Sequence, residues 1–125
     1  MTNAFPTVTV PADKYMMVMP DYCSGGLWCR GGAEMCDGTQ FLSDMLQARL
    51  RAWCRDYESV PIRFEDTDPE PAPLCGWDAF SAEGAEIALA IKRELPDWEI
   101  WYFDEKAMND GLPREQHRIQ IILSA

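Results

Sequence analysis

Three apolar runs in the sequence predict strands of one sheet. Residues 15–19 are apolar on both alternating faces, which is typical of a strand buried inside a sheet, and Pro20 ends the run. Residues 98–104 form a second strand rich in aromatic side chains. Residues 118–123 alternate between apolar and polar side chains, so we expect them to pair with residues 98–104 as an antiparallel hairpin. Residues 7–10 and 60–64 are weaker candidates for short strands.

Two amphipathic segments predict helices. The first runs from near Thr39 to about Tyr57, because apolar residues recur in it at spacings of three and four. The second starts at Ser81, whose hydroxyl can cap a helix, and stops at Pro96. Gly84 lies on the apolar side of this second helix, and the absence of a side chain there favours close packing against a neighbour.

The order of these elements predicts an α+β fold in a single domain that spans residues 1–125. We expect a mixed sheet of about four strands with two helices packed on one face, in the order β-α-(β)-α-β-β. Residues 1–13 are expected to form a loosely ordered arm. Residues 65–80 are expected to form an irregular loop, because their beginning is acidic and rich in proline.

Composition and charge narrow the classes of partner. The chain has 125 residues with 47% hydrophobic residues and five tryptophans, so it belongs to the folded proteins rather than to the disordered ones. No apolar run is long enough for a transmembrane helix, and the N-terminus lacks the pattern of a signal peptide, which predicts a cytoplasmic protein. The net charge of −10 argues against nucleic acid and membrane as partners and fits a basic protein partner. The alternative is an acidic cytoplasmic protein whose charge serves only its solubility.

The loop of residues 21–38 concentrates the chemically reactive side chains. It holds Cys23, Cys29 and Cys36, but five and six residues separate them, and none of these pairs forms the closely spaced knuckle of a structural zinc site. Cys36 precedes the first helix and could be a nucleophile if His117, the single histidine, served as its base. The spacings therefore predict neither a metal site nor catalytic residues, and no cofactor. A zinc- or thiol-dependent protein that uses this loop remains the alternative.

Two groups of residues are candidates for binding a protein partner. The first is acidic and lies in the proline-rich loop: Glu65, Asp66, Asp68 and Glu70. The second is aromatic and consists of Trp101 and Phe103 on one face of the strand predicted at residues 98–104, with Trp28 of the cysteine-rich loop. Exposed aromatic side chains are typical anchors of protein interfaces. The alternative is that helices bury one face of this strand and the loop around Trp28 buries the other.

A set of residues between about 15 and 105 resembles a family of small uncharacterised bacterial proteins. The pattern consists of Asp21, Tyr22, Leu27, Trp28, Leu46, Arg49, Leu50, Trp53, Tyr57, Phe80, Glu83, Gly84, Ala88, Glu94, Leu95, Trp98, Tyr102 and Phe103. The resemblance implies no catalytic residues, because no activity is assigned to that family, and its pattern does not include the cysteines at 23, 29 and 36.

These observations lead to one functional hypothesis and leave the oligomeric state open. The chain is predicted to be a non-enzymatic acidic protein that binds a macromolecular partner. Immunity proteins against toxins and phage-type inhibitors share its size, its charge and its lack of catalytic motifs.

Overall fold

The computed structural model describes residues 13–22, 24–35, 38–60 and 72–124. Its four strands form one mixed sheet in the order β2-β1-β3-β4. β1 (Tyr15–Val18) pairs antiparallel with β2 (Leu27–Trp28) and parallel with β3 (Glu99–Phe103). β3 pairs antiparallel with β4 (Arg118–Ile121), as the sequence predicted. The expected α+β fold with a mixed four-stranded sheet is therefore confirmed.

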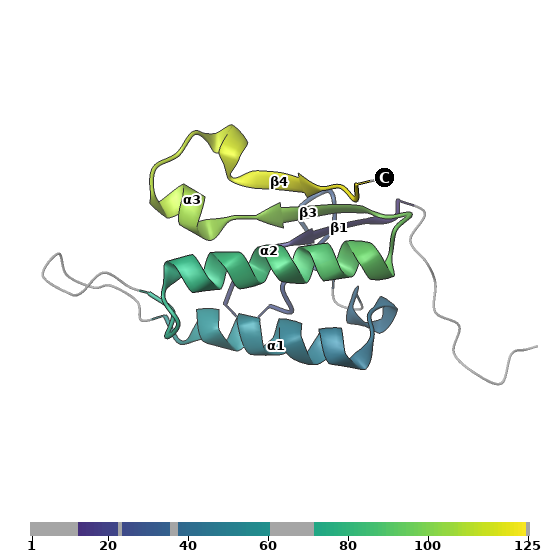
Figure 1. Cartoon of the computed structure of the whole chain (residues 1–125), viewed down its shortest axis with the longest axis horizontal. Helices are drawn as coiled ribbons and strands as arrows, with labels where there is room; N and C mark the ends of the chain where they lie inside the picture. The colour runs from purple at the N-terminus through teal and green to yellow at the C-terminus, as the bar shows by residue number, and fades with distance from the viewer. Residues whose placement is uncertain (1–12, 23, 36–37, 61–71, 125) are drawn as a thin grey trace, which may run out of the picture.

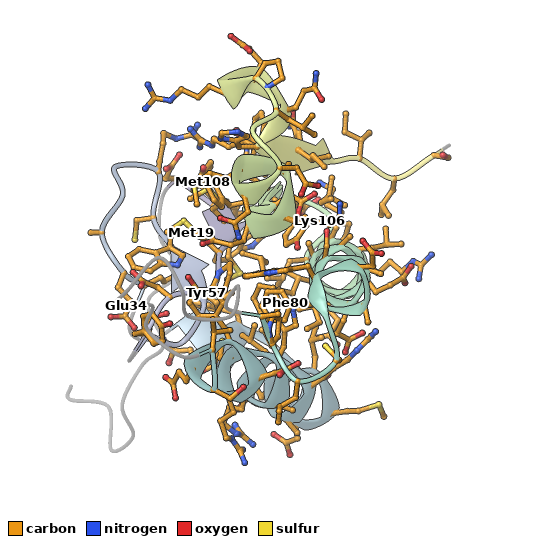
Figure 2. All side chains as sticks on the ribbon, turned by 90° about the vertical axis from the view of Figure 1, so that its left-hand side faces the viewer. Met19, Glu34, Tyr57, Phe80, Lys106 and Met108 are labelled. Atoms are coloured by element: carbon orange, nitrogen blue, oxygen red, sulfur yellow. The ribbon has the colours of Figure 1, made fainter. Side chains whose placement is uncertain are left out.

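Both long helices lie on the same face of the sheet (Figure 1). α1 (Asp44–Glu58) and α2 (Trp77–Glu94) run side by side, and α2 packs against β3. One apolar core joins them to the strands; it includes Met16 and Val18 of β1, Ile100 and Tyr102 of β3, Leu50 and Trp53 of α1, and Phe80, Ile87 and Ile91 of α2. Figure 2 views the helices end-on, with Tyr57 and Phe80 close together. The helices thus cover one face and leave the other to shorter segments.

The starts of both helices differ from those predicted. α1 begins at Asp44, because the hydroxyl of Ser43 accepts a hydrogen bond from the Leu46 amide, whereas Gly38–Phe41 form a separate 3₁₀ turn, η1. α2 begins at Trp77, one turn before the predicted cap. Ser81 is inside the helix, and its hydroxyl donates to Asp104 rather than to the start of α2. The Ser81 hydroxyl does form a hydrogen bond, as the sequence suggested, but its partner Asp104 is distant in the sequence.

Two further elements arise where the sequence predicted only loops. β2 lies within the cysteine- and glycine-rich loop, and it supplies the fourth strand of the described sheet. A short helix, α3 (Glu105–Asn109), follows β3 because Asp104 caps it by accepting from the Lys106 amide. It is followed by a 3₁₀ turn, η2 (Arg114–Gln116). The candidate strands at 7–10 and 60–64 fall wholly or mainly outside the described residues.

No helix in the described parts of the chain is long and apolar enough to cross a membrane. The cytoplasmic location stays a prediction.

Gly84 is the point of closest approach between α2 and its neighbours. A methyl group at this position would lie 2.6 Å from Cζ2 of Trp53 and 2.6 Å from Cε1 of Tyr102. Both rings are buried, and hydrogen bonds hold them in place: Trp53 Nε1 donates to the Phe80 carbonyl, and the Tyr102 hydroxyl donates to the Ser81 carbonyl. The close packing predicted for this glycine is confirmed.

Gly84→Ala should therefore destabilise the fold. Overpacking of a core costs about 1–3 kcal/mol, and the higher helix propensity of alanine returns only roughly 1 kcal/mol of that. Urea unfolding should show a lower midpoint than the wild type. Gly31→Ala is the matched control, because a methyl group there meets nothing within 4 Å. Equal midpoints for Gly84→Ala and the wild type would contradict the close packing.

Candidate functional site

The face of the sheet opposite the helices is the candidate site, and we call it the open face. Residues paired across neighbouring strands project to the same side of a sheet. The register aligns Met17 of β1 with Trp28 of β2 and with Trp101 of β3, and it aligns Phe103 with Arg118 of β4. On β3, Ile100 and Tyr102 are buried towards the helices, whereas the side chains on the open face are only half-buried.

The open face unites the three aromatic residues that the sequence proposed for partner binding. Trp28, Trp101 and Phe103 come from two strands far apart in the sequence, and each is half-buried. Trp28 donates its indole N–H to the Met19 carbonyl at 2.9 Å, and Trp101 donates to Glu99 at 2.6 Å. The acidic candidates Glu65, Asp66, Asp68 and Glu70 lie outside the described residues.

Two arginines and two aromatic rings form a ladder across the open face. The guanidinium of Arg30 lies over the Tyr15 ring, 4.4 Å from its centroid, and donates to Asp13 and Glu99. Arg118 donates to the Tyr15 hydroxyl at 2.9 Å, and its guanidinium carbon lies 5.5 Å from the centroid of the Trp101 ring. Cation–π contacts of this kind hold both arginines against the sheet. The hydrogen bonds from Arg30 and from Trp101 lower the pKa of Glu99.

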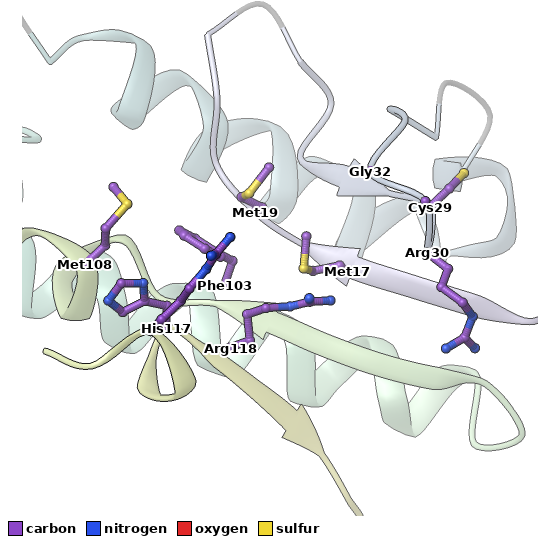
Figure 3. A pocket seen from close by; sticks show the side chains of 11 residues that line it. Met17, Met19, Cys29, Arg30, Gly32, Phe103, Met108, His117 and Arg118 are labelled. Carbon is purple, nitrogen blue, oxygen red and sulfur yellow. The ribbon is translucent and has the colours of Figure 1, made fainter.

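Beside this ladder the open face is hollowed into a groove of about 610 Å³ (Figure 3). Four of its lining side chains are apolar: Met17, Met19, Phe103 and Met108. The polar ones are all cationic or neutral: Cys29, Arg30, Arg114, His117 and Arg118. Figure 3 shows His117 and Met108 at one end of the groove and Arg30 towards the other. A second hollow of about 400 Å³ adjoins it and shares the three arginines.

The arginines of this groove were not among the residues proposed from the sequence. Arg30 lies in the glycine-rich loop, while Arg114 and Arg118 flank the start of the last strand. The one feature of the sequence that could have pointed to them is that basic residues are scarce in this chain, which has 21 acidic and 11 basic residues. Because they are distant in the sequence, only the strand pairing shows that they converge.

Two of the three described cysteines lie in surroundings that disfavour the thiolate. Burial raises the pKa of Cys54 to about 11. The hydrogen bond that Cys75 makes with Asp56 raises the pKa of this exposed thiol as well. A raised pKa reduces the fraction of reactive thiolate. Cys29 is half-buried at the groove, and no group of described residues has the composition of a metal site.

The remaining cysteine candidates fall outside what the structure describes. Cys23 and Cys36 lie outside the residues that the structure describes, so the roles considered for them stay untested. His117, which the alternative with a Cys36 nucleophile would need as its base, has its Nε2 atom 2.8 Å from the Leu112 carbonyl oxygen. A carbonyl oxygen only accepts, so this nitrogen carries a proton.

A second cluster of titratable groups lies where α1 meets the start of α3. The Tyr57 hydroxyl donates to Glu105 at 3.1 Å, and the Tyr57 ring lies 5.2 Å from that of Tyr22, centroid to centroid. Burial, above all, and the charges of Asp21 and Asp104 raise the pKa of Glu105. The hydrogen bond thus links α1 to α3 through a carboxyl group that is costly to ionise.

The comparison with known protein families shows to which family the chain belongs. The family model described as Serratia CdiI immunity protein-like matches residues 14–105. The chain belongs to the Serratia CdiI immunity protein-like family. The matched region of this CdiI-like chain runs from the start of β1 to the first residue of α3, so it contains β1, β2, β3 and both long helices but not β4. No curated protein and no solved structure matches the chain.

Glu105→Gln should change how the stability of this CdiI-like protein depends on pH. A folded-state pKa above the unfolded value of about 4.3 means that protonation stabilises the fold, and that this stabilisation is lost as pH rises through the folded pKa. Glutamine can still accept the hydrogen bond from Tyr57 without ionising. The stability of Glu105→Gln relative to the wild type, measured by urea unfolding, should therefore rise as the pH increases above the unfolded pKa of about 4.3.

Glu86→Gln is the matched control, because Glu86 is an exposed glutamate on α2. If Glu105→Gln and the wild type depend on pH in the same way, the inferred cost of ionising Glu105 is wrong.

Proposed function

We propose that this chain is an immunity protein that binds a protein toxin and neutralises it without catalysis. The observation that carries the proposal is the match of residues 14–105 to a family of CdiI-like immunity proteins. An immunity protein inhibits its toxin by binding to it, so its functional site is a binding surface rather than a set of catalytic groups.

The open face supports a binding role because it combines a concave shape with aromatic and charged groups. Trp28, Trp101 and Phe103 are half-buried there and retain surface to offer a partner. Tryptophan and arginine are enriched among the residues that dominate binding energy in protein interfaces. A groove of about 610 Å³ can receive one or a few side chains of the toxin.

The acidic loop is the second part of the proposed surface. Glu65, Asp66, Asp68 and Glu70 supply negative charge in a chain whose net charge is already −10. Such a field attracts a basic protein and speeds the encounter with it, most strongly at low ionic strength. We therefore propose a toxin with a basic surface as the partner.

The decisive experiment captures the toxin and tests whether the chain protects against it. The tagged full-length chain is used to retain proteins from its native host at low and at high salt. The retained protein is then produced in a test strain alone and together with the chain. We expect growth arrest in the first case and normal growth in the second. A retained protein that is harmless when produced alone would overturn the proposal.

A single variant locates the interface on the open face. Phe103→Ala removes an aromatic anchor beside the groove and should weaken toxin binding by about tenfold or more, as interface aromatics commonly do. Met45→Ala is the control, because Met45 is a large apolar side chain on α1 that is 83% exposed. Affinities are measured by calorimetry after thermal unfolding has shown that both variants fold. Equal affinities for Phe103→Ala and Met45→Ala would remove the open face from the interface.

A further inference from the structure

The groove of the open face has a chemical preference of its own. We propose that it binds a segment of the toxin in which an apolar side chain is flanked by carboxylates. The inference rests on the proposed function, and it adds that the toxin, although basic overall, presents an acidic and apolar segment at this point.

The charge of the groove is opposite to that of the chain. None of its described lining residues is acidic, although acidic residues outnumber basic ones by almost two to one in the whole sequence. Arg30 is neutralised by Asp13 and Glu99. Within the described residues, neither Arg114 nor Arg118 forms a salt bridge, and Arg118 has only the Tyr15 hydroxyl as a side-chain hydrogen-bond partner.

Two arginines that have no salt bridge among the described residues, and that lie beside an apolar floor, are suited to carboxylates. The guanidinium fork matches a carboxylate with two parallel hydrogen bonds, which are stronger than bonds between neutral groups. Arg118 is already oriented by Tyr15 and Trp101, so less side-chain entropy is lost when it pairs. Two described acidic residues, Glu99 and Glu115, line the adjoining hollow, but neither lines the groove, and Glu99 is already paired with Arg30.

The floor of the groove is suited to an apolar side chain of variable shape. Met17 and Phe103 project from the sheet, and Met108 of α3 is 40% exposed at the end of the groove (Figure 3). Methionine side chains are flexible and polarisable, so they adapt to the surface of a bound group. A segment with both kinds of group would satisfy the floor and the arginines together.

This cationic side of the groove lies beyond the region shared with the family model. The match ends at residue 105, and Met108, Arg114, His117 and Arg118 all follow it. The segment after α3 therefore supplies a preference that the family match does not itself account for.

The first experiment tests the groove without the toxin. The probe is a capped hexapeptide of alternating aspartate and phenylalanine, and its control is the same peptide with asparagine in place of aspartate. Both are titrated into ¹⁵N-labelled full-length chain and followed by NMR. We expect the acidic peptide to shift the amide signals of Met17, Phe103 and Arg118, and the asparagine peptide to leave them in place. Absent shifts, or equal shifts with both peptides, would overturn the inference.

The second experiment tests the toxin complex. Arg114→Glu should raise the dissociation constant for the toxin at least about tenfold, because it places a like charge against the carboxylates of the segment. We expect this exchange to leave the fold intact, because the Arg114 side chain has no salt bridge or hydrogen bond to the described residues. Arg51→Glu on α1 is the charge-matched control and should bind like the wild type.

The two failures are distinguishable. If the unchanged chain binds no toxin, the proposed function fails. If the unchanged chain binds the toxin and Arg114→Glu binds it equally well, the immunity role stands and the preference of the groove is wrong.

Discussion

The close approach of α2 to the sheet at Gly84 is the constraint on which the rest of the structure depends. At this position, Trp53 of α1 and Tyr102 of β3 both occupy the space that a side chain would take. Trp53 also stacks on Phe80, with ring centroids 4.7 Å apart, so a single cluster joins both long helices to the central part of the sheet. Since the two long helices pack on this face, the opposite face is bordered by the loop around Arg30 and by the short segments α3 and η2.

This division explains why the candidate binding surface lies on the open face. The face of the sheet that the helices cover is filled by apolar side chains of the core, so a partner cannot reach it. The open face keeps the other half of the same strands, with aromatic rings, arginines and a groove. Membership of the CdiI-like immunity family makes protein binding the expected activity, and a half-buried aromatic surface is a physical means of achieving it.

Charge and local chemistry act at different ranges in this protein. The net charge of −10 is a property of the whole chain and influences encounters across roughly a Debye length. The arginines of the groove act only on groups that touch them, and two of them, Arg30 and Arg118, are held in place by Tyr15 and Trp101. An acidic chain can therefore attract a basic partner and still receive a carboxylate at one point of the interface.

The sequence by itself determined the elements whose signal is local: the buried strand β1, the aromatic strand β3, the antiparallel pairing of β3 with β4, and the apolar stripes of both helices. Gly84 also indicated close packing. Glycine lowers helix propensity, so its position on the apolar side of a helix indicates that a neighbouring element needs the space of the missing side chain. The helix starts, β2 and α3 depended on contacts across the fold. Ser81 bonds to Asp104 instead of capping α2, and the two residues of β2 become a strand only by pairing with β1. The groove was equally invisible, because Arg30 and Arg118 are 88 positions apart and meet only through the register of the sheet.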